Sequence, residues 1–173
     1  MTPAMETLSA QAYQRKLSTM VIAEILAHDS VMSGLKVTSK KQALQELSKR
    51  VSKNYNLVER EVFQVLLERE KLGSTGVGNG IAIPHGKINN LNCLCGYFAR
   101  LERPVDFEAV DERPVDLIFL LLAPESAGAD HLKALALVSR LMRDTSVCEK
   151  LRGSDSQEAL YALLTDQAAH QAA

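Results

Sequence analysis

The chain has 173 residues, 46% of them hydrophobic, and its 20 basic and 21 acidic residues give a net charge of −1. This length and apolar content fit one globular domain with a substantial core. The balanced charge excludes electrostatic attraction to nucleic acid or to an anionic membrane as the basis of function.

The sequence also indicates where the protein works. The longest apolar run, from Leu117 to Pro124, is too short to span a bilayer, and the N-terminus lacks the basic and then apolar order of a signal peptide. The three cysteines form no CxxC pair, which fits reduced thiols. We therefore expect a cytoplasmic protein with no membrane insertion and no nucleic-acid partner.

The first third of the chain predicts helices. Residues 1–16 are polar without a clear period and predict a flexible tail, followed by a short helix over residues 17–26 and a strand over 31–37. Ser39 and Gln42 form a capping box, after which apolar residues repeat at helical spacing. A second helix is expected over residues 57–71, with an inner face made of Val58, Val62, Val65 and Leu66.

A glycine-rich segment follows and carries the strongest functional signal. Residues 73–80 hold four glycines, too many for a helix or a plain strand, and predict a shaped loop. The apolar residues 81–83 predict a short buried strand, and Pro84 stiffens the backbone after it. His85 thus stands on a rigid support, and Gly86 adds no side chain that would keep another molecule from the imidazole.

The remaining elements alternate between strand and helix. A strand is expected over residues 93–102, ended by Pro104, with Cys93 and Cys95 facing the core. The continuous apolar run over 115–123 is typical of a strand covered on both faces.

Helices are expected to complete the domain. One begins at the N-cap Asp130, and its buried stripe is Leu132, Leu135, Val138 and Met142. Two shorter helices are expected near residues 146–151 and 157–164, the second capped by Ser154 or Asp155, before a frayed tail at 166–173. This order predicts the α/β class, with a single-domain sandwich over residues 17–165 and helices on both faces of a sheet.

The familiar phosphate-binding and catalytic motifs do not match the glycine segment. Gly80 and Gly86 have the wrong spacing for a P-loop, and the earlier glycines have the wrong spacing for a dinucleotide fingerprint. Ser74 lacks a nucleophile elbow, and no HExxH or closely spaced Cys/His set predicts a zinc site. Nucleophilic chemistry by His85 remains, because a neutral imidazole has a free lone pair and its phosphoramidate can pass a phosphoryl group onward.

Such chemistry has three requirements, and the sequence offers a candidate for each. Arg69, at the end of the preceding helix, can neutralise the phosphoryl oxygens as a bidentate fork. Ser74, Thr75 and the loop N–H groups can donate hydrogen bonds to those oxygens. The imidazole also needs a partner that fixes its tautomer, such as a backbone carbonyl.

His131 has two interpretations that the sequence leaves open. It falls in the first turn of a helix, where N–H groups and the helix dipole favour an anion, so it can help to bind a phosphoryl group on His85. Alternatively, it is merely a polar residue at a position that accepts any polar residue.

At this point the sequence resembles a known family. The segment around His85 reads LLEREKLGSTGVGNGIAIPHGK and is similar, without gaps, to the active-site segment of the fructose/mannitol-type IIA proteins of the bacterial phosphoenolpyruvate-dependent phosphotransferase system. The nitrogen-regulatory IIA branch is most similar. Weaker similarity covers residues 17–164, including PVDLIFLLLAP and DHLKALALVSRL.

The resemblance implies that the sheet, for which the elements above predict about five strands, is mixed, and it gives roles to three residues. His85 matches the phosphorylated histidine, Arg69 the residue that holds the phosphoryl group, and His131 the second active-site histidine; Ser74, Thr75 and Gly86 complete the expected phosphoryl site. The phosphoryl donor would be a small histidine phosphocarrier, charged by an Enzyme I-type protein. No metal or organic cofactor is implied.

The resemblance leaves two functions within the family and one outside it. A nitrogen-regulatory member would signal through its phosphorylation state to targets such as potassium-transport proteins or sensor kinases. A sugar-specific member would pass the phosphoryl group to a IIB domain. Outside the family, the same loop could bind a small anion or a partner without covalent chemistry.

Overall fold

The structure is a computed structural model that describes residues 20–166. The predicted N-terminal tail at 1–16, most of the predicted C-terminal tail at 166–173 and the start of the helix expected at 17–26 lie outside the described residues. Within them, the first helix is α2, Ile22–Ile25.

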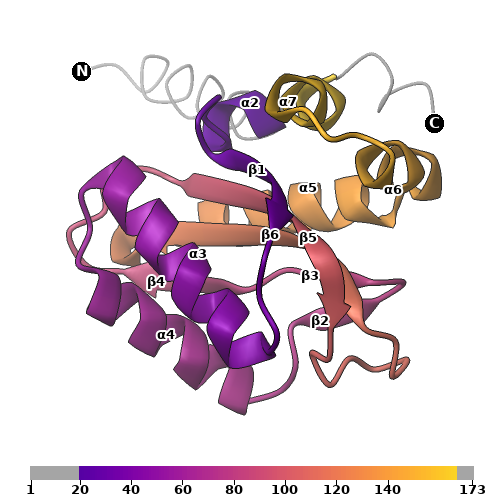
Figure 1. Ribbon diagram of the computed structural model, residues 1–173. Helices are drawn as coiled ribbons and strands as arrows, with labels where there is room; N and C mark the ends of the chain where they lie inside the picture. Colours follow the sequence, from indigo (N-terminus) through magenta and orange to yellow (C-terminus); the bar gives the residue numbers. More distant parts are fainter. Residues whose placement is uncertain (1–19, 167–173) are drawn as a thin grey trace, which may run out of the picture.

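The centre of the fold is a six-stranded mixed sheet (Figure 1). The main strand order is β1-β5-β6-β3-β2, and β4 also pairs with β6. Pairing is antiparallel between β5 and β6 and between β2 and β3, and parallel elsewhere. The strands are β1 Val31–Leu35, β2 Gly76–Gly78, β3 Ile81–Ala82, β4 His85–Ile88, β5 Cys95–Val105 and β6 Val115–Pro124.

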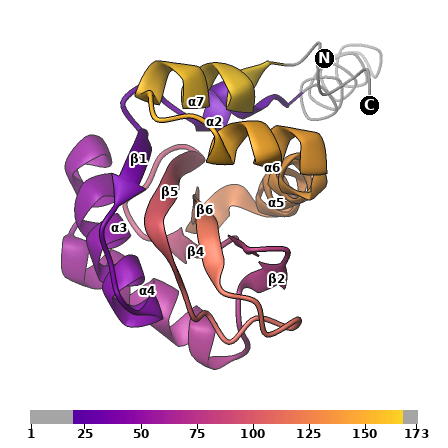
Figure 2. The same cartoon turned by 45° about the vertical axis from the view of Figure 1, so that its right-hand side comes forward.

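Helices cover both faces of the sheet, as Figure 2 shows. One face carries α3, Lys40–Tyr55, and α4, Glu59–Lys71, and the other carries α2 with three later helices. These are α5 Ala129–Arg143, preceded by the 3₁₀ turn η1 Glu125–Ala127, then α6 Thr145–Arg152 and α7 Gln157–Thr165. The predicted α/β sandwich is confirmed, with six strands in place of about five.

The long apolar strand β6 explains why the sheet is covered on both sides. Successive side chains of a strand point to opposite faces. Leu117, Phe119 and Leu121 pack into the core under α5 to α7, whereas the residues between them pack into the core under α3 and α4. All are fully buried, as predicted from the unbroken apolar run.

Two short strands, β3 and β4, run along the same edge of β6. Residues 83 and 84 separate the two strands. Ile81 pairs with Leu117 and His85 pairs with Leu121, so β3 and β4 pair with β6 in the same register. Pro84 lies between β3 and β4, and its carbonyl accepts a hydrogen bond from the Leu121 N–H at 2.9 Å. His85 is therefore the first residue of a strand that is anchored to the most buried element of the fold.

The glycine-rich segment contains more regular structure than a loop. Gly76–Gly78 forms β2, antiparallel to β3, so the prediction of a loop throughout residues 73–80 is wrong. Asn79 and Gly80 connect the two strands with φ of 57° and 80°. Asn-Gly is a strong signal for a tight hairpin, because both turn residues need positive φ.

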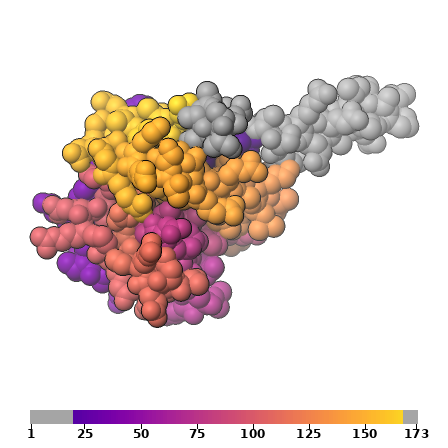
Figure 3. Space-filling view, turned by 90° about the vertical axis from the view of Figure 1, so that its right-hand side faces the viewer, coloured from indigo at the N-terminus to yellow at the C-terminus, as the bar shows by residue number. Residues whose placement is uncertain are grey.

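An arginine of α6 fastens this hairpin. Arg152 donates two hydrogen bonds to the Asp116 carboxylate, at 2.9 and 3.0 Å, and one to the Asn79 carbonyl at 2.7 Å. In the space-filling view, the orange and yellow atoms of the C-terminal helices lie directly against the magenta hairpin region (Figure 3). The hairpin tip is thereby tied to both α6 and β6.

Several predicted boundaries need correction. β5 continues through Pro104 and does not end before it. At this point the parallel pairing with β1 has already ended, at Leu101, and the pairing with β6 is irregular between Arg100 and Val105. The proline, which has no backbone N–H, therefore costs the sheet no hydrogen bond. Cys93 precedes the strand and is exposed, whereas Cys95 is buried as predicted. Ser156, and neither Ser154 nor Asp155, caps α7.

Helix starts and faces also differ at three positions. α5 begins one residue before Asp130, with Gly128 as N-cap, because the 3₁₀ turn η1 leads directly into it. Leu132 is 68% exposed and Val58 is 58% exposed, so neither belongs to the predicted buried stripes. Half of the predicted capping box is confirmed, because the Ser39 hydroxyl accepts from the Gln42 N–H at 3.1 Å. The Gln42 side chain accepts from the N–H of Thr38 at 2.7 Å, one residue before the position that a capping box requires. Within residues 20–166, no helix combines the length and the apolar character that crossing a membrane requires.

The hairpin turn yields a stability prediction. A Cβ atom on Gly80 would lie 2.7 Å from the Arg152 Nη2 and 2.8 Å from the Asp116 Oδ1, at a φ of +80°. Gly34 has a similar φ of +72° with no neighbouring atom within 4 Å of such a Cβ. Gly34→Ala should cost about 1–2 kcal/mol for positive φ alone, and Gly80→Ala should cost about 1–3 kcal/mol more for the steric conflict. Urea unfolding of both variants measures the difference, and equal losses would contradict the steric argument.

Candidate functional site

His85 is half-buried at the start of β4, and its ring has one fixed partner. Its Nδ1 lies 2.8 Å from the carbonyl oxygen of Ile83. A carbonyl only accepts hydrogen bonds, so Nδ1 carries the proton in the neutral ring and Nε2 keeps the lone pair. No hydrogen bond to Nε2 occurs within residues 20–166. The backbone carbonyl expected from the sequence is thus that of Ile83, and Nε2 is the nitrogen left for chemistry.

The surroundings favour the neutral form of this imidazole. Burial lowers the pKa of His85 below its usual value of 6.5, and the charge of Arg69 lowers it further, whereas the hydrogen bond to Ile83 and the charge of Glu70 act in the opposite direction. Burial is the largest effect. At neutral pH the lone pair on Nε2 is therefore present, as a nucleophile requires.

Arg69 lies in the last turn of α4, as predicted, and is half-buried. Its Nη1 donates to the Gly73 carbonyl at 2.9 Å, which holds the side chain over the start of the glycine segment. Across the described chain, no carboxylate comes within ion-pairing distance of this guanidinium. Arg69 is close enough to lower the pKa of His85, so the site contains a cation without a resident counter-ion.

His131, in the first turn of α5, lies beside His85. The two ring centroids are 5.8 Å apart, and the rings are inclined by 54°. The Nε2 of His131 is buried and has no hydrogen-bond partner among residues 20–166. A buried polar atom without a partner is rare and fits a position that a ligand completes. Burial lowers the pKa of His131, and the charges of His85 and Lys87 lower it further.

Ser74 and Thr75 do not present free hydroxyl donors to His85. The Ser74 hydroxyl donates to the Phe107 carbonyl at 2.5 Å and accepts from the Gly76 N–H at 3.0 Å. The hydroxyl and the N–H of Thr75, which is buried, both donate to the carboxylate of Glu70. These two residues shape the loop, and their donors are already occupied in this structure.

Residue 86 is a glycine for a different reason from the one expected. A Cβ atom at this position would lie 2.5 Å from the Cγ1 of Val65. The missing side chain leaves room for α4, which packs against β4 there, and not for an incoming molecule. The glycine thus brings the helix that carries Arg69 close to the strand that carries His85.

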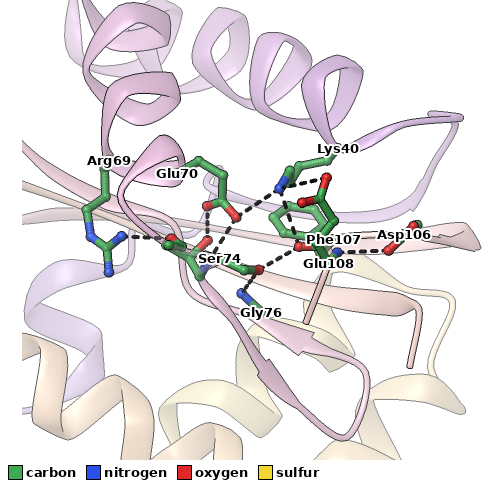
Figure 4. A network of polar contacts seen from close by, with 10 residues as sticks. Lys40, Arg69, Glu70, Ser74, Gly76, Asp106, Phe107 and Glu108 are labelled. Carbon is green, nitrogen blue, oxygen red and sulfur yellow. Dashed lines mark hydrogen bonds and ion pairs between the residues drawn. The ribbon is translucent and has the colours of Figure 1, made fainter. Parts of the chain in front are cut away.

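Sequence reasoning missed Glu70, the residue after Arg69. Its side chain is only 3% exposed and forms an ion pair with Lys40 of α3, Oε1 to Nζ, at 3.4 Å (Figure 4). Charged side chains are almost never this buried unless they are paired. In the sequence, Glu70 stands in a run of alternating charges that is typical of a solvated helix end, so no sequence signal marked it.

The arrangement has the parts needed to receive an anion on a histidine. A neutral ring offers Nε2, and a second ring lies beside it with an unpaired nitrogen. Arg69 and the exposed Lys87 add positive charge, and the N-terminus of α5, which no side chain caps, adds the positive end of its helix dipole. Among the described residues, no three His, Cys, Asp or Glu side chains gather as they would around a metal ion.

Comparison with known proteins identifies similar chains over almost the whole described region. Residues 24–167 match the family model described as the phosphoenolpyruvate-dependent sugar phosphotransferase system, EIIA 2. A nitrogen regulatory protein of Bradyrhizobium diazoefficiens is 56% identical over 145 residues, which is 84% of this chain and 95% of that protein. One from Escherichia coli is 42% identical over 151 residues, 86% of this chain and 92% of that protein.

A solved structure agrees in fold as well as in sequence. The crystal structure of nitrogen regulatory protein IIA-Ntr from Neisseria meningitidis aligns with a TM-score of 0.79 at 40% identity. The alignment covers 83% of this chain and 99% of that one.

The environment of His85 yields a prediction about its titration. Because burial and Arg69 disfavour the imidazolium, the NMR titration midpoint of His85 should lie below 6.5, and the neutral ring should persist to lower pH than in a free histidine. In Arg69→Ala the midpoint should rise, because a nearby positive charge is lost. A wild-type midpoint above 6.5, or a fall in the variant, would contradict this electrostatic description.

Proposed function

The chain belongs to the EIIA 2 family of the phosphoenolpyruvate-dependent sugar phosphotransferase system, and we propose that it accepts a phosphoryl group on Nε2 of His85 from a small histidine phosphocarrier. The observation that carries this proposal is the 2.8 Å hydrogen bond between the His85 Nδ1 and the Ile83 carbonyl. It leaves Nε2 as the unprotonated nitrogen of a ring that burial keeps neutral.

The transfer is an in-line exchange between two imidazoles. The lone pair of His85 Nε2 attacks phosphorus, a new N–P bond forms, and the N–P bond of the phosphocarrier breaks with its electron pair returning to that ring. No proton moves in this step. His85 keeps its Nδ1 proton in the hydrogen bond to Ile83 and becomes a phosphorylated imidazolium, while the phosphocarrier ring, with its other nitrogen protonated, leaves as a neutral imidazole. The protein contributes position and charge stabilisation, which dominate phosphoryl transfer.

The charge on the transferred group needs compensation, and two side chains beside His85 can provide it. Arg69 can donate two parallel N–H bonds to the phosphoryl oxygens once its guanidinium leaves or shares its contact with Gly73. His131 faces His85 with an unpartnered Nε2. Because opposite charge favours the protonated form, the phosphoryl dianion should raise the pKa of His131 and make it a donor.

The nitrogen regulatory relatives favour a regulatory output over sugar transport. A phosphoryl group adds about −1.5 to −2 charges at pH 7. The exposed Leu72 is the C-cap of the helix that carries Arg69, and the exposed Leu132 follows His131 in the chain. We infer that this change of charge beside apolar side chains switches binding to target proteins. Potassium-transport proteins and sensor kinases are the target classes that we propose.

Phosphorylation of the intact protein tests the proposal. After incubation with phosphoenolpyruvate, the Enzyme I-type protein and the phosphocarrier, mass spectrometry should detect one acid-labile phosphoryl group, located on His85 and absent in His85→Ala. His28→Ala is the matched control, because His28 is exposed and stacks on Tyr161 of α7. An unmodified wild-type protein would support the non-covalent binding module, and stoichiometric transfer onward to a IIB domain would support the sugar-specific role.

Arg69 should have a large kinetic effect with little structural effect. Arg69→Ala should slow single-turnover transfer from the phosphocarrier by roughly 10²-fold or more, as loss of one electrostatic donor does. Arg69→Lys keeps the charge but loses the bidentate geometry of the guanidinium, so its transfer rate should lie between those of the wild type and Arg69→Ala. Arg60→Ala, on the exposed face of the same helix, should leave the rate unchanged. Equal rates in Arg69→Ala and wild type, with folding verified by circular dichroism, would remove Arg69 from the mechanism.

A further inference from the structure

A buried carboxylate lies next to the guanidinium of the site. Glu70 follows Arg69 in α4, yet it is only 6% exposed. Two donors come from one residue, since the Thr75 N–H and hydroxyl donate to its two oxygens at 3.0 and 2.5 Å. The third donor is a cation, the Lys40 Nζ, which lies 3.4 Å from the Oε1 of Glu70. Three donor groups therefore converge on the carboxylate and compensate for its burial.

The hydrogen bonds continue from Thr75 to the reactive imidazole. The Thr75 carbonyl accepts from the Ile83 N–H at 3.0 Å. The Ile83 carbonyl in turn is the partner of His85 Nδ1 at 2.8 Å. One continuous series of hydrogen bonds thus links Glu70, Thr75, Ile83 and His85.

The same helical turn also fixes the cation of the site. The Gly73 N–H donates to the Glu70 carbonyl at 3.2 Å, and the Gly73 carbonyl accepts from Arg69 at 2.9 Å. Figure 4 shows the side chains of Arg69 and Glu70 on opposite sides of the loop that both of them hold. The last turn of α4 therefore sets the position of the guanidinium directly and that of the imidazole through Thr75.

We propose that Glu70 is a positioning residue, whose carboxylate holds Thr75 and, through it, the Ile83 carbonyl that keeps His85 in the tautomer with Nε2 free. Lys40 pairs with the carboxylate and offsets the cost of its burial. The effect of Glu70 on phosphoryl transfer rests on the proposed function. Its effect on the tautomer of His85 is a property of the unphosphorylated protein.

A carboxylate suits this task better than an amide of the same shape. Its oxygens only accept hydrogen bonds, which matches the N–H, the hydroxyl and the ammonium around it. In Glu70→Gln, an NH₂ group replaces one of these oxygens, so the Thr75 hydroxyl has to reverse its hydrogen bond and the negative charge that pairs with Lys40 is lost. The charge of Glu70 also acts directly on the ring, since it raises the pKa of His85.

The alternative is that the Glu70–Lys40 pair only joins α3 to the end of α4. Lys40 has other partners there, because its Nζ lies 3.4 Å from the Phe107 carbonyl and 3.7 Å from Glu108. A purely structural pair would change the stability of the protein without changing the tautomer of His85. The two roles therefore differ in a measurable property of the ring.

The test is the tautomer of His85 in the full-length, unphosphorylated protein, read from the ¹⁵N shifts of the ring at a pH where it is neutral. In the wild type, Nδ1 should have the shift of a protonated nitrogen and Nε2 that of an unprotonated one. In Glu70→Gln and in Thr75→Val, the two shifts should move toward each other as the second tautomer becomes populated. Thr75→Ser keeps the hydroxyl and should keep the wild-type shifts.

Asp116→Asn is the matched control. It breaks the ion pair with Arg152 that clamps the tip of the same hairpin, but it lies outside the series that ends at Ile83. Its His85 shifts should remain those of the wild type. By analogy with residues that orient reactive histidines, transfer from the phosphocarrier should fall about 10- to 100-fold in Glu70→Gln and stay near the wild-type rate in Asp116→Asn.

Unchanged His85 shifts in a folded Glu70→Gln variant would overturn the proposal and leave the pair a purely structural role. If Glu70→Gln does not fold, the comparison of Thr75→Val with Thr75→Ser decides, and identical shifts in these two would overturn it equally. If the wild type takes up no phosphoryl group, the proposed function fails. The tautomer comparison then still decides the positioning role, because it needs no phosphorylation.

Discussion

The hydrogen bond between the His85 Nδ1 and the carbonyl of Ile83 is the interaction on which the site depends. It spans only two residues, across Pro84, and it selects the ring nitrogen that carries the proton. A histidine without such a partner exchanges between two tautomers and rotates about its side-chain bonds. Here a short stretch of backbone fixes both properties, so the direction of the lone pair follows from the position of the strand edge.

The sheet makes that edge rigid. β6 is buried on both faces and pairs with β3 and β4 in one register on either side of Pro84. Two separate cores, one on each face, hold β6 in place. α4 approaches β4 closely because residue 86 is a glycine. His85 and Arg69 therefore belong to two elements that pack directly against each other.

The charges and hydrogen-bond donors around His85 favour an anion. Both imidazoles are shifted toward the neutral form, Arg69 has no carboxylate partner in the described part of the chain, and one nitrogen of His131 has no partner there. The single buried carboxylate nearby, Glu70, is matched by Lys40 and Thr75 and turned away from Arg69. Family membership gives the class of chemistry, and this distribution of charge supports the proposal that the site accepts a phosphoryl group.

The sequence by itself determined the sandwich, the doubly covered strand β6 and the association of His85 and Arg69 with a stiff glycine-rich segment. These properties depend on periodicity, composition and local backbone chemistry, which are readable along the chain. Only the tertiary structure decided which hydrogen-bond partners the polar side chains near His85 have and which of these side chains are buried. The Ser74 hydroxyl donates to a carbonyl 33 residues away, and Glu70 is buried. Gly86 likewise accommodates Val65. Such partners are brought together by packing between distant segments, and no local pattern specifies them.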